Sequence, residues 1–131
     1  MKIAICPGSY DPVTYGHLDI IKRSAVLVDK LIVTVFVNPS KKASLFSIEE
    51  RLDMLRETTK DIPNVEVDTS TGLLNVYAAS KNCHLIIRGL RAFSDFEYEF
   101  QRALMIKKID PTLETAFFMT DGRYSYLSST G

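Results

Sequence analysis

Short apolar runs alternate with amphipathic helical patterns along the whole chain. The longest run, residues 31–37, is apolar on both faces apart from Thr34. This pattern is typical of a central strand in a parallel sheet, because helices cover both faces of such a sheet. Four further runs have the length and composition of strands. We expect the strands at Ile3–Cys6, Leu31–Val37, Val65–Val67, Leu85–Ile87 and Thr115–Met119.

Helical patterns lie between these runs. In each of them apolar residues recur every three or four positions, so that one stripe of the helix faces a core. Ser47 and Glu50 have the spacing of a capping box just before the second pattern, and Pro111 is expected to close the fourth helix. The patterns are Leu18, Ile21, Ala25 and Val28; Ile48, Leu52, Leu55 and Thr59; a helix from about Leu73 to Lys81; and Phe96, Phe100, Ala103 and Lys107.

The order of these elements predicts the fold class. Strands and helices alternate, and right-handed crossovers then produce an α/β fold with a doubly wound, parallel five-stranded sheet and helices on both faces. The chain has 131 residues and contains no internal repeat, low-complexity tract or long linker. We therefore expect one domain over residues 1–131.

Composition and charge narrow the possible partners. Hydrophobic residues make up 46% of the chain and charged residues 24%, and the 16 basic residues balance the 16 acidic ones. No global field draws such a chain to nucleic acid or to an anionic membrane, and no run approaches the roughly 20 apolar residues that span a bilayer. Cys6 and Cys83 lack CxxC spacing, so neither a disulfide nor a metal site is expected. We expect a cytoplasmic protein without nucleic-acid or membrane partners.

The loop between the first strand and the first helix has the residues that bind phosphate. Gly8 and Gly16 allow a close approach of the main chain, while Ser9 and Thr14 offer hydroxyl groups. His17 falls in the first turn of the helix, where unpaired N–H groups favour an anion. The sequence therefore predicts a phosphate site at this turn.

Three other loops are expected at the same edge of the sheet. They follow the second, fourth and fifth strands and contain residues 38–42, 88–91 and 121–130, which supply lysine, arginine and hydroxyl side chains. Because ligands of open parallel sheets bind beyond the carboxyl ends of the strands, this asymmetry indicates a polyanion site. Neither GxxxxGK[ST] nor GxGxxG is present, so a P-loop and a dinucleotide fingerprint are not supported.

Several motifs match a known family. Residues 7–12 with Thr14-Tyr15-Gly16-His17 resemble the [T/H]xGH motif of the nucleotidyltransferase superfamily. Lys41-Lys42, residues 46–51, residues 87–92 and residues 95–99 narrow this likeness to the bacterial phosphopantetheine adenylyltransferase family, over residue 2 to the last residue. The resemblance implies transfer of AMP from ATP to 4′-phosphopantetheine, which gives dephospho-coenzyme A and pyrophosphate. It also implies a homo-hexamer, Mg²⁺ bound through the ATP phosphates rather than by the protein, and coenzyme A as a further ligand.

The resemblance also implies roles for individual residues. The implied catalytic residues are His17, Lys41 and Arg91. The implied contacts to 4′-phosphopantetheine are Ser9, Lys41, Leu73, Leu74, Arg88 and Met105. The implied contacts to ATP are Gly8, Ser9, Tyr10, Gly16, His17, Gly89, Arg91, Asp95, Glu99, Tyr124, Ser128, Ser129 and Thr130. The alternative to phosphate binding by Arg88 and Arg91 is a structural role, in which they form an ion pair with Asp95 or Glu99.

The chain departs from the family pattern at several places. The family continues past Gly131 into a helical segment, which we expect this chain to lack. Full activity is therefore not expected of these 131 residues by themselves. Arg102 and Ile106 stand where an apolar residue and an amide are expected beside the pantetheine arm. Two other functions stay open: transfer of a nucleotidyl group to another acceptor, such as nicotinate or nicotinamide mononucleotide, and nucleotide binding without catalysis.

Overall fold

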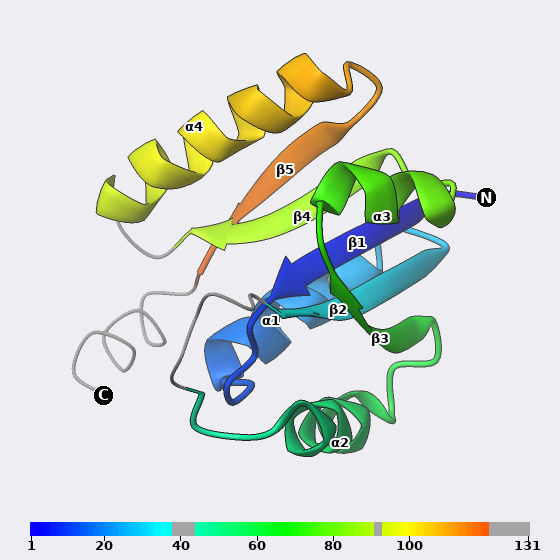
Figure 1. Cartoon of the computed structure of the whole chain (residues 1–131). Helices are drawn as coiled ribbons and strands as arrows, with labels where there is room; N and C mark the ends of the chain where they lie inside the picture. Colours follow the sequence, from blue (N-terminus) through cyan, green and yellow to red (C-terminus); the bar gives the residue numbers. More distant parts are fainter. Residues whose placement is uncertain (38–43, 91–92, 121–131) are drawn as a thin grey trace.

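The computed structural model describes residues 1–37, 44–90 and 93–120 of the chain (Figure 1). Strands and helices alternate strictly, and all paired strands run parallel. The predicted α/β class with a parallel five-stranded sheet is therefore confirmed. The elements are β1 (Ile3–Gly8), α1 (Tyr15–Ala25), β2 (Lys30–Val37), α2 (Ile48–Thr59), β3 (Val65–Thr71), α3 (Leu74–Ser80), β4 (Leu85–Leu90), α4 (Phe93–Ile109) and β5 (Glu114–Met119).

The strand order of the sheet is β3-β2-β1-β4-β5, with β1 in the centre. The chain winds outward from β1 through β2 to β3, and it then crosses back through α3 to β4 on the other side of β1. The strand order therefore reverses between β1 and β4. Such a switch point leaves a crevice beyond the carboxyl ends of the two strands, which is where doubly wound folds bind their ligands.

Two apolar layers hold the helices to the sheet, one on each face. Ile21 of α1 and Leu55 of α2 are fully buried in one layer with Val33 of β2. Ile5 and Ile86 are buried in the other layer, which includes residues of α3 and α4. Figure 1 shows α1 and α2 on one side of the sheet and α3 and α4 on the other. Alternate residues of each central strand thus face different helix pairs, which explains why residues 31–37 are apolar on both faces apart from Thr34.

Thr34, the polar exception in β2, is completely buried but hydrogen-bonded. Its hydroxyl donates to the Tyr77 hydroxyl oxygen at 3.1 Å, and Tyr77 in turn donates to the Asp68 carboxylate at 2.6 Å. Lys81 lies 3.3 Å from the same carboxylate. Burial and the hydrogen bond to Asp68 both raise the pKa of Tyr77, which keeps it a neutral donor. This network attaches α3 to β2 and β3.

The strands extend further than the apolar runs predicted. β3 continues to Thr71 through Asp68, Thr69 and Ser70, and each of these residues is paired in register with β2. β3 is an edge strand, so its main chain is held by the ladder while its polar side chains meet solvent. β1 and β4 likewise extend to Gly8 and Leu90. Apolar content marks only the part of a strand whose side chains enter a core.

Helix α2 begins as its sequence suggests. Ser47 caps α2: its hydroxyl accepts the Glu50 amide at 3.1 Å, and the Glu50 carboxylate accepts the Ser47 amide at 2.9 Å. The predicted capping box is therefore confirmed. α4 ends at Ile109, two residues before Pro111. None of the helices in the described ranges has the length and apolar content needed to cross a membrane.

Candidate active site

Two cavities lie beside the carboxyl end of β1, at the switch point of the sheet. The larger has a volume of about 870 Å³ and the smaller about 480 Å³. Both are lined by Pro7, Gly8, Ser9, Asp11 and Arg88, so the β1–α1 turn and the end of β4 form the wall between them. This position agrees with the edge predicted from the loops that follow β1 and β4.

The smaller cavity contains the start of α1. His17 is the third residue of this helix, and the Thr14 amide donates to its Nδ1 at 2.9 Å. An N–H group can only donate, so Nδ1 acts as an acceptor and the proton of the neutral ring is on Nε2. The Thr14 hydroxyl accepts the His17 amide at 3.2 Å, which completes a capping box. His17 therefore has a fixed ring orientation with Nε2–H as its second hydrogen-bonding group.

Thr14 and Ser9 were both expected to offer hydroxyl groups to a phosphate. The Thr14 hydroxyl instead serves as the helix cap, whereas Ser9 is exposed on the wall shared by the two cavities. Of the two, Ser9 is the residue whose position suits contact with a ligand.

Gly8 and Gly89 have a packing role at this edge. A Cβ added at Gly8 would lie 3.0 Å from the Tyr10 ring, and one added at Gly89 would lie 3.2 Å from Ile20 Cγ1. Both contacts are tighter than most, so the Tyr10 or Ile20 side chain would have to shift by a few tenths of an ångström. The two glycines thus let β1 pack closely against Tyr10 and β4 against Ile20 of α1, and both line the smaller cavity.

Tyr10 is a buried anchor of the turn. Its side chain is 2% exposed, and its hydroxyl donates to the Cys6 carbonyl at 2.9 Å. Burial raises the pKa of Tyr10 well above its usual range, so the phenol stays protonated. The ring contacts the His17 imidazole edge-on at a centroid distance of 4.8 Å. Any contact of Tyr10 with a nucleotide would come from its main chain, since the side chain faces the core.

Arg88 and Glu99 form a bidentate ion pair between the cavities. Arg88 Nε lies 2.9 Å from Glu99 Oε1, and Nη2 lies 2.7 Å from Oε2. Arg88 Nη1 also donates to the Pro7 carbonyl at 3.4 Å. The side chains are only 18% and 14% exposed, respectively. The ion-pair alternative is thus observed for Arg88, but its position on both cavities keeps a phosphate contact open.

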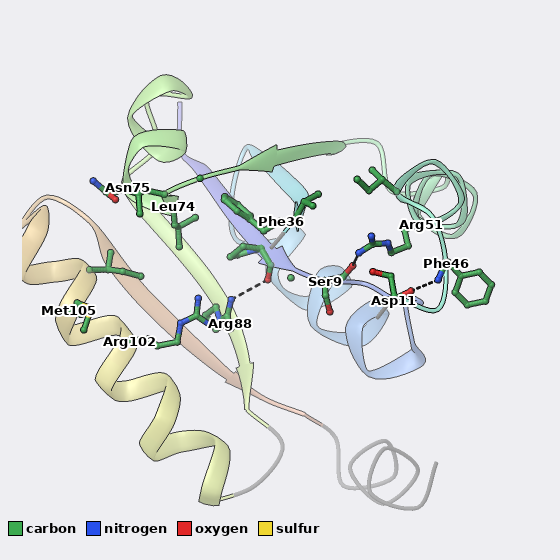
Figure 2. A pocket seen from close by; sticks show the side chains of 18 of the residues that line it. Ser9, Asp11, Phe36, Phe46, Arg51, Leu74, Asn75, Arg88, Arg102 and Met105 are labelled. Carbon is green, nitrogen blue, oxygen red and sulfur yellow. Dashed lines mark hydrogen bonds between the residues drawn. The ribbon is translucent and has the colours of Figure 1, made fainter. Parts of the chain in front are cut away.

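The larger cavity has apolar walls from α3 and α4. Leu73, Leu74 and Met105 line it, as expected for the arm of the acceptor, together with Phe36 from β2. Figure 2 shows Leu74 and Asn75 facing Met105 and Arg102 across this cavity. Ile106 and Arg102, the two departures from the family pattern, are both part of its lining.

Sequence reasoning assigned no role to two residues that shape the site. Arg51 of α2 is 6% exposed and donates from Nη1 to the Ser9 carbonyl at 3.1 Å. The Asp11 carboxylate accepts the Leu45 and Phe46 amides, each at 2.8 Å (Figure 2). These bonds connect the β1–α1 turn to the segment before α2. Arg51 lies next to Leu52 of the apolar stripe. In the sequence, this cation beside apolar positions was the available signal that Arg51 has a structural partner.

Several residues implied by the resemblance lie outside the described residues. They are Lys41, Arg91, Tyr124, Ser128, Ser129 and Thr130. Asp95 belongs to α4, but its side chain is not described. The roles of these residues therefore stay predictions.

Comparison with known proteins identifies the family. A cytidylyltransferase-like family model matches residues 5–131. A phosphopantetheine adenylyltransferase of Caldanaerobacter subterraneus subsp. tengcongensis is 62% identical over 130 residues, which cover 99% of this chain and 81% of that protein. One from Clostridium tetani is 57% identical with the same coverage. The chain belongs to the phosphopantetheine adenylyltransferase family. The resemblance found in the motifs is thereby confirmed.

Solved structures with a similar fold come from related families. A putative nicotinate-nucleotide adenylyltransferase from Vibrio parahaemolyticus has a TM-score of 0.64 at 15% identity, covering 98% of this chain and 80% of that one. A bifunctional NMN adenylyltransferase/ADP ribose pyrophosphatase from Francisella tularensis, complexed with AMP and a manganese ion, has a TM-score of 0.64 at 16% identity, covering 99% and 42%. At these identities, the likeness shows only that this chain has the Rossmann-like fold of these structures. Nothing in it favours the alternative acceptors.

Proposed function

We propose that this chain transfers AMP from ATP to 4′-phosphopantetheine and releases pyrophosphate, a step of coenzyme A synthesis. The observation that carries the proposal is the pair of cavities that meet at Ser9 and Arg88. The smaller cavity, with His17 at a helix start, suits the phosphates of ATP. The larger one, with Leu74 and Met105, suits a long acceptor arm that ends in a phosphate near Arg88. The two reacting groups would then meet at the common wall.

The chemistry suits a site made of donors and cations. The attacking group is a phosphate oxygen of the acceptor, which is already ionised at neutral pH, so it needs no general base and no covalent protein nucleophile. The difficulty lies in bringing two anions together and in stabilising charge as the α-phosphorus becomes five-coordinate. Positioning supplies about 7–11 kcal/mol in favourable cases, and one well-aimed donor about 3–4 kcal/mol.

His17 is the described residue best suited to that donor role. Its Nδ1 accepts the Thr14 amide, so Nε2–H is directed away from the helix cap and donates to the α-phosphate in our proposal. This interaction strengthens as charge builds on the phosphate oxygens in the transition state. Lys41 and Arg91 complete the catalytic set, in keeping with the family motif, and Arg88 binds the acceptor phosphate.

We further propose that Mg²⁺ enters with ATP. The carboxylates of Asp11, on the common wall, and of Glu99, on the smaller cavity, both accept N–H donors: Asp11 from Leu45 and Phe46, and Glu99 from Arg88. That donor set fits an ion held mainly by phosphate oxygens better than one held in a protein cage. When bound, the ion would offset the charge of the phosphates.

Coenzyme A and dephospho-coenzyme A contain the same arm and would occupy the larger cavity. We also propose a cytoplasmic location, where these metabolites are made, and a homo-hexameric assembly. Large apolar side chains on the surface of α4, among them Phe100, Leu104 and Ile109, support assembly in general.

Pyrophosphate release with a panel of acceptors tests the proposed reaction. Purified chain is incubated with ATP and Mg²⁺ together with 4′-phosphopantetheine, nicotinate mononucleotide, nicotinamide mononucleotide or no acceptor. We expect release with 4′-phosphopantetheine only. Release with a mononucleotide alone would favour the second class of acceptor. ATP binding without release in any tube would instead indicate a non-catalytic nucleotide-binding domain.

A further inference from the structure

Arg102 on α4 places a second cation at the Arg88–Glu99 pair. Its Nη1 lies 3.9 Å from Glu99 Oε2, the same oxygen that accepts Arg88 Nη2 at 2.7 Å. Arg102 also stacks its guanidinium over the Tyr98 ring at 5.7 Å, and its side chain is 45% exposed. Figure 2 shows Arg102 extending from α4 toward Arg88 on β4. The two arginines therefore share one carboxylate: both arginines line the larger cavity, whereas Glu99 lines the smaller one.

The charge of this cluster depends on Arg102. A bidentate Arg88–Glu99 pair is neutral as a unit, so a phosphate entering the cavity would meet a guanidinium whose charge is already balanced. With Arg102 beside the same carboxylate, the three groups carry a net single positive charge. Because Arg88 and Glu99 are largely shielded from solvent, charges around them are screened less than at an open surface.

Arg88 has hydrogen-bonding capacity left for a phosphate. Its bonds to Glu99 and to the Pro7 carbonyl use three N–H groups among the described contacts. An arginine has five such groups, so one N–H on each terminal nitrogen can still donate. Arg88 can thus keep Glu99 on one edge and bind a phosphate on the other. The penalty in that arrangement is repulsion between Glu99 and the phosphate, and Arg102 lies where it offsets this repulsion.

We propose that Arg102 is a specificity-determining residue of the larger cavity, which selects acceptors with a terminal phosphate by neutralising Glu99 while Arg88 binds that phosphate. This inference rests on the proposed function, since it takes 4′-phosphopantetheine as the acceptor. It adds a role to a position where the family pattern has an apolar residue. The selection is electrostatic and does not require Arg102 to touch the phosphate.

The test compares two ligands that differ only by the phosphate. Dissociation constants for 4′-phosphopantetheine and for pantetheine are measured by titration calorimetry on the full chain, and their ratio reports the preference for the phosphate. For Arg102→Leu we expect this ratio to fall by about three- to tenfold, the range for a partly solvated charge near an anion. Arg102→Lys should keep most of the preference. The matched control is Lys108→Leu, which removes an exposed cation from the same helix outside the cavity lining.

Each other outcome contradicts the role of Arg102. An unchanged ratio in Arg102→Leu, or an equal fall in Lys108→Leu, would overturn it. Equal weakening of both ligands would assign Arg102 to the arm rather than to phosphate selection, and a loss of folding would also weaken both equally. If the unmodified chain itself shows no preference for the phosphorylated ligand, the proposed acceptor fails as well. If the unmodified chain prefers the phosphorylated ligand and Arg102→Leu keeps the same preference, the proposed function stands and only this inference fails.

Discussion

His17 combines a structural role at the start of α1 with the donor role that we propose for it. Its Nδ1 and main-chain N–H complete the cap of α1 with Thr14, and the same bonds fix the orientation of the ring, with the proton of the neutral ring on Nε2. These local hydrogen bonds would by themselves explain a histidine at the start of a helix. In our proposal, the same bonds also pre-organise His17 as a donor. At the residue scale, structural and chemical roles need not compete.

We expect His17→Ala to lower kcat by about 100-fold or more while the KM for ATP changes little, because the proposed contact strengthens chiefly in the transition state. Steady-state kinetics of pyrophosphate release measure both constants. The matched control is His84→Ala, which removes the other of the two histidines, whose ring lies near Thr112 away from the cavities. An unchanged kcat in His17→Ala would contradict the donor role.

Arg51 shows how a residue outside the predicted set supports the site. It is nearly buried and donates to the main-chain carbonyls of Ser9 and Ser47 at 3.1 and 3.4 Å. The bond to Ser9 holds the turn that separates the two cavities. A cation beside the apolar stripe of α2 was a signal in the sequence, but it did not indicate which loop Arg51 would reach.

For Arg51→Ala we expect a loss of about 2 kcal/mol in the free energy of unfolding, because partly buried hydrogen bonds from a charged donor to two main-chain carbonyls are lost. Urea denaturation followed by circular dichroism measures this change. Arg56→Ala is the control on the same helix, since Arg56 forms only an exposed pair with Asp53 and should cost well under 1 kcal/mol. Equal stability of the two variants would show that the contact to Ser9 contributes little.

At the scale of the elements, α3 illustrates how a short helix is held in place. It spans only Leu74–Ser80, and its N-cap Leu73 has no side-chain cap bond. Its stability must therefore come from contacts to the sheet, among them the chain of bonds from Thr34 through Tyr77 to Asp68. Since α3 supplies Leu74 and Asn75 to the larger cavity, this network also shapes the ligand site.

The Asp68 network makes part of the stability dependent on pH. Partial burial would raise the pKa of Asp68, but hydrogen bonds from Tyr77, Thr69 and Lys81 outweigh it, so the pKa is lowered on folding. A carboxylate with a lowered folded pKa stabilises the fold above its unfolded pKa, and this contribution is lost as the pH falls through the folded value.

We therefore expect Asp68→Asn to be less stable than the unmodified chain near pH 7, with a difference that shrinks as the pH falls below about 4. Urea denaturation between pH 7 and pH 3 measures it. Asp53→Asn, on an exposed part of α2, is the control and should show a smaller difference at pH 7. A difference that stays constant down to pH 3 would argue against an ionised Asp68 as the cause.

At the scale of the whole molecule, the exposed face of α4 is the feature that a single chain leaves unexplained. Phe96, Phe100 and Leu104 follow one another at helical spacing and are all at least 43% exposed, and the Phe96 and Phe100 rings stack at 5.6 Å. Side chains of this kind are costly to leave in water over a contiguous area. This face is where we expect subunits to meet in the proposed assembly.

Sedimentation equilibrium should give a mass six times the 14.8 kDa of one chain. Leu104→Glu should shift the mass toward smaller species, because it places a charge in the expected contact. The control Leu27→Glu changes an exposed leucine that follows α1. A monomeric mass for the unmodified chain would contradict the hexamer.

The pattern of apolar residues was sufficient to predict the fold class, and the motif at residues 7–17 was sufficient to predict the edge of the sheet at which the two cavities lie. Strand cores and helix stripes depend on local periodicity, which the sequence displays directly. The motif likewise indicated its chemistry, because Gly16 and His17 are adjacent in the chain as well as in the site. Both kinds of information are local, so no three-dimensional structure was needed to read them.

Only the tertiary structure determined which distant residues act together. The pairing of Arg88 with Glu99 and Arg102, the bond of Arg51 to Ser9, and the division of the site into two cavities all join segments that are far apart in the chain. The same holds for the packing reason for Gly8 and Gly89. A sequence states what each residue can donate, accept or bury. Which partner it meets is decided by the crossovers of the sheet and by the space left between packed helices.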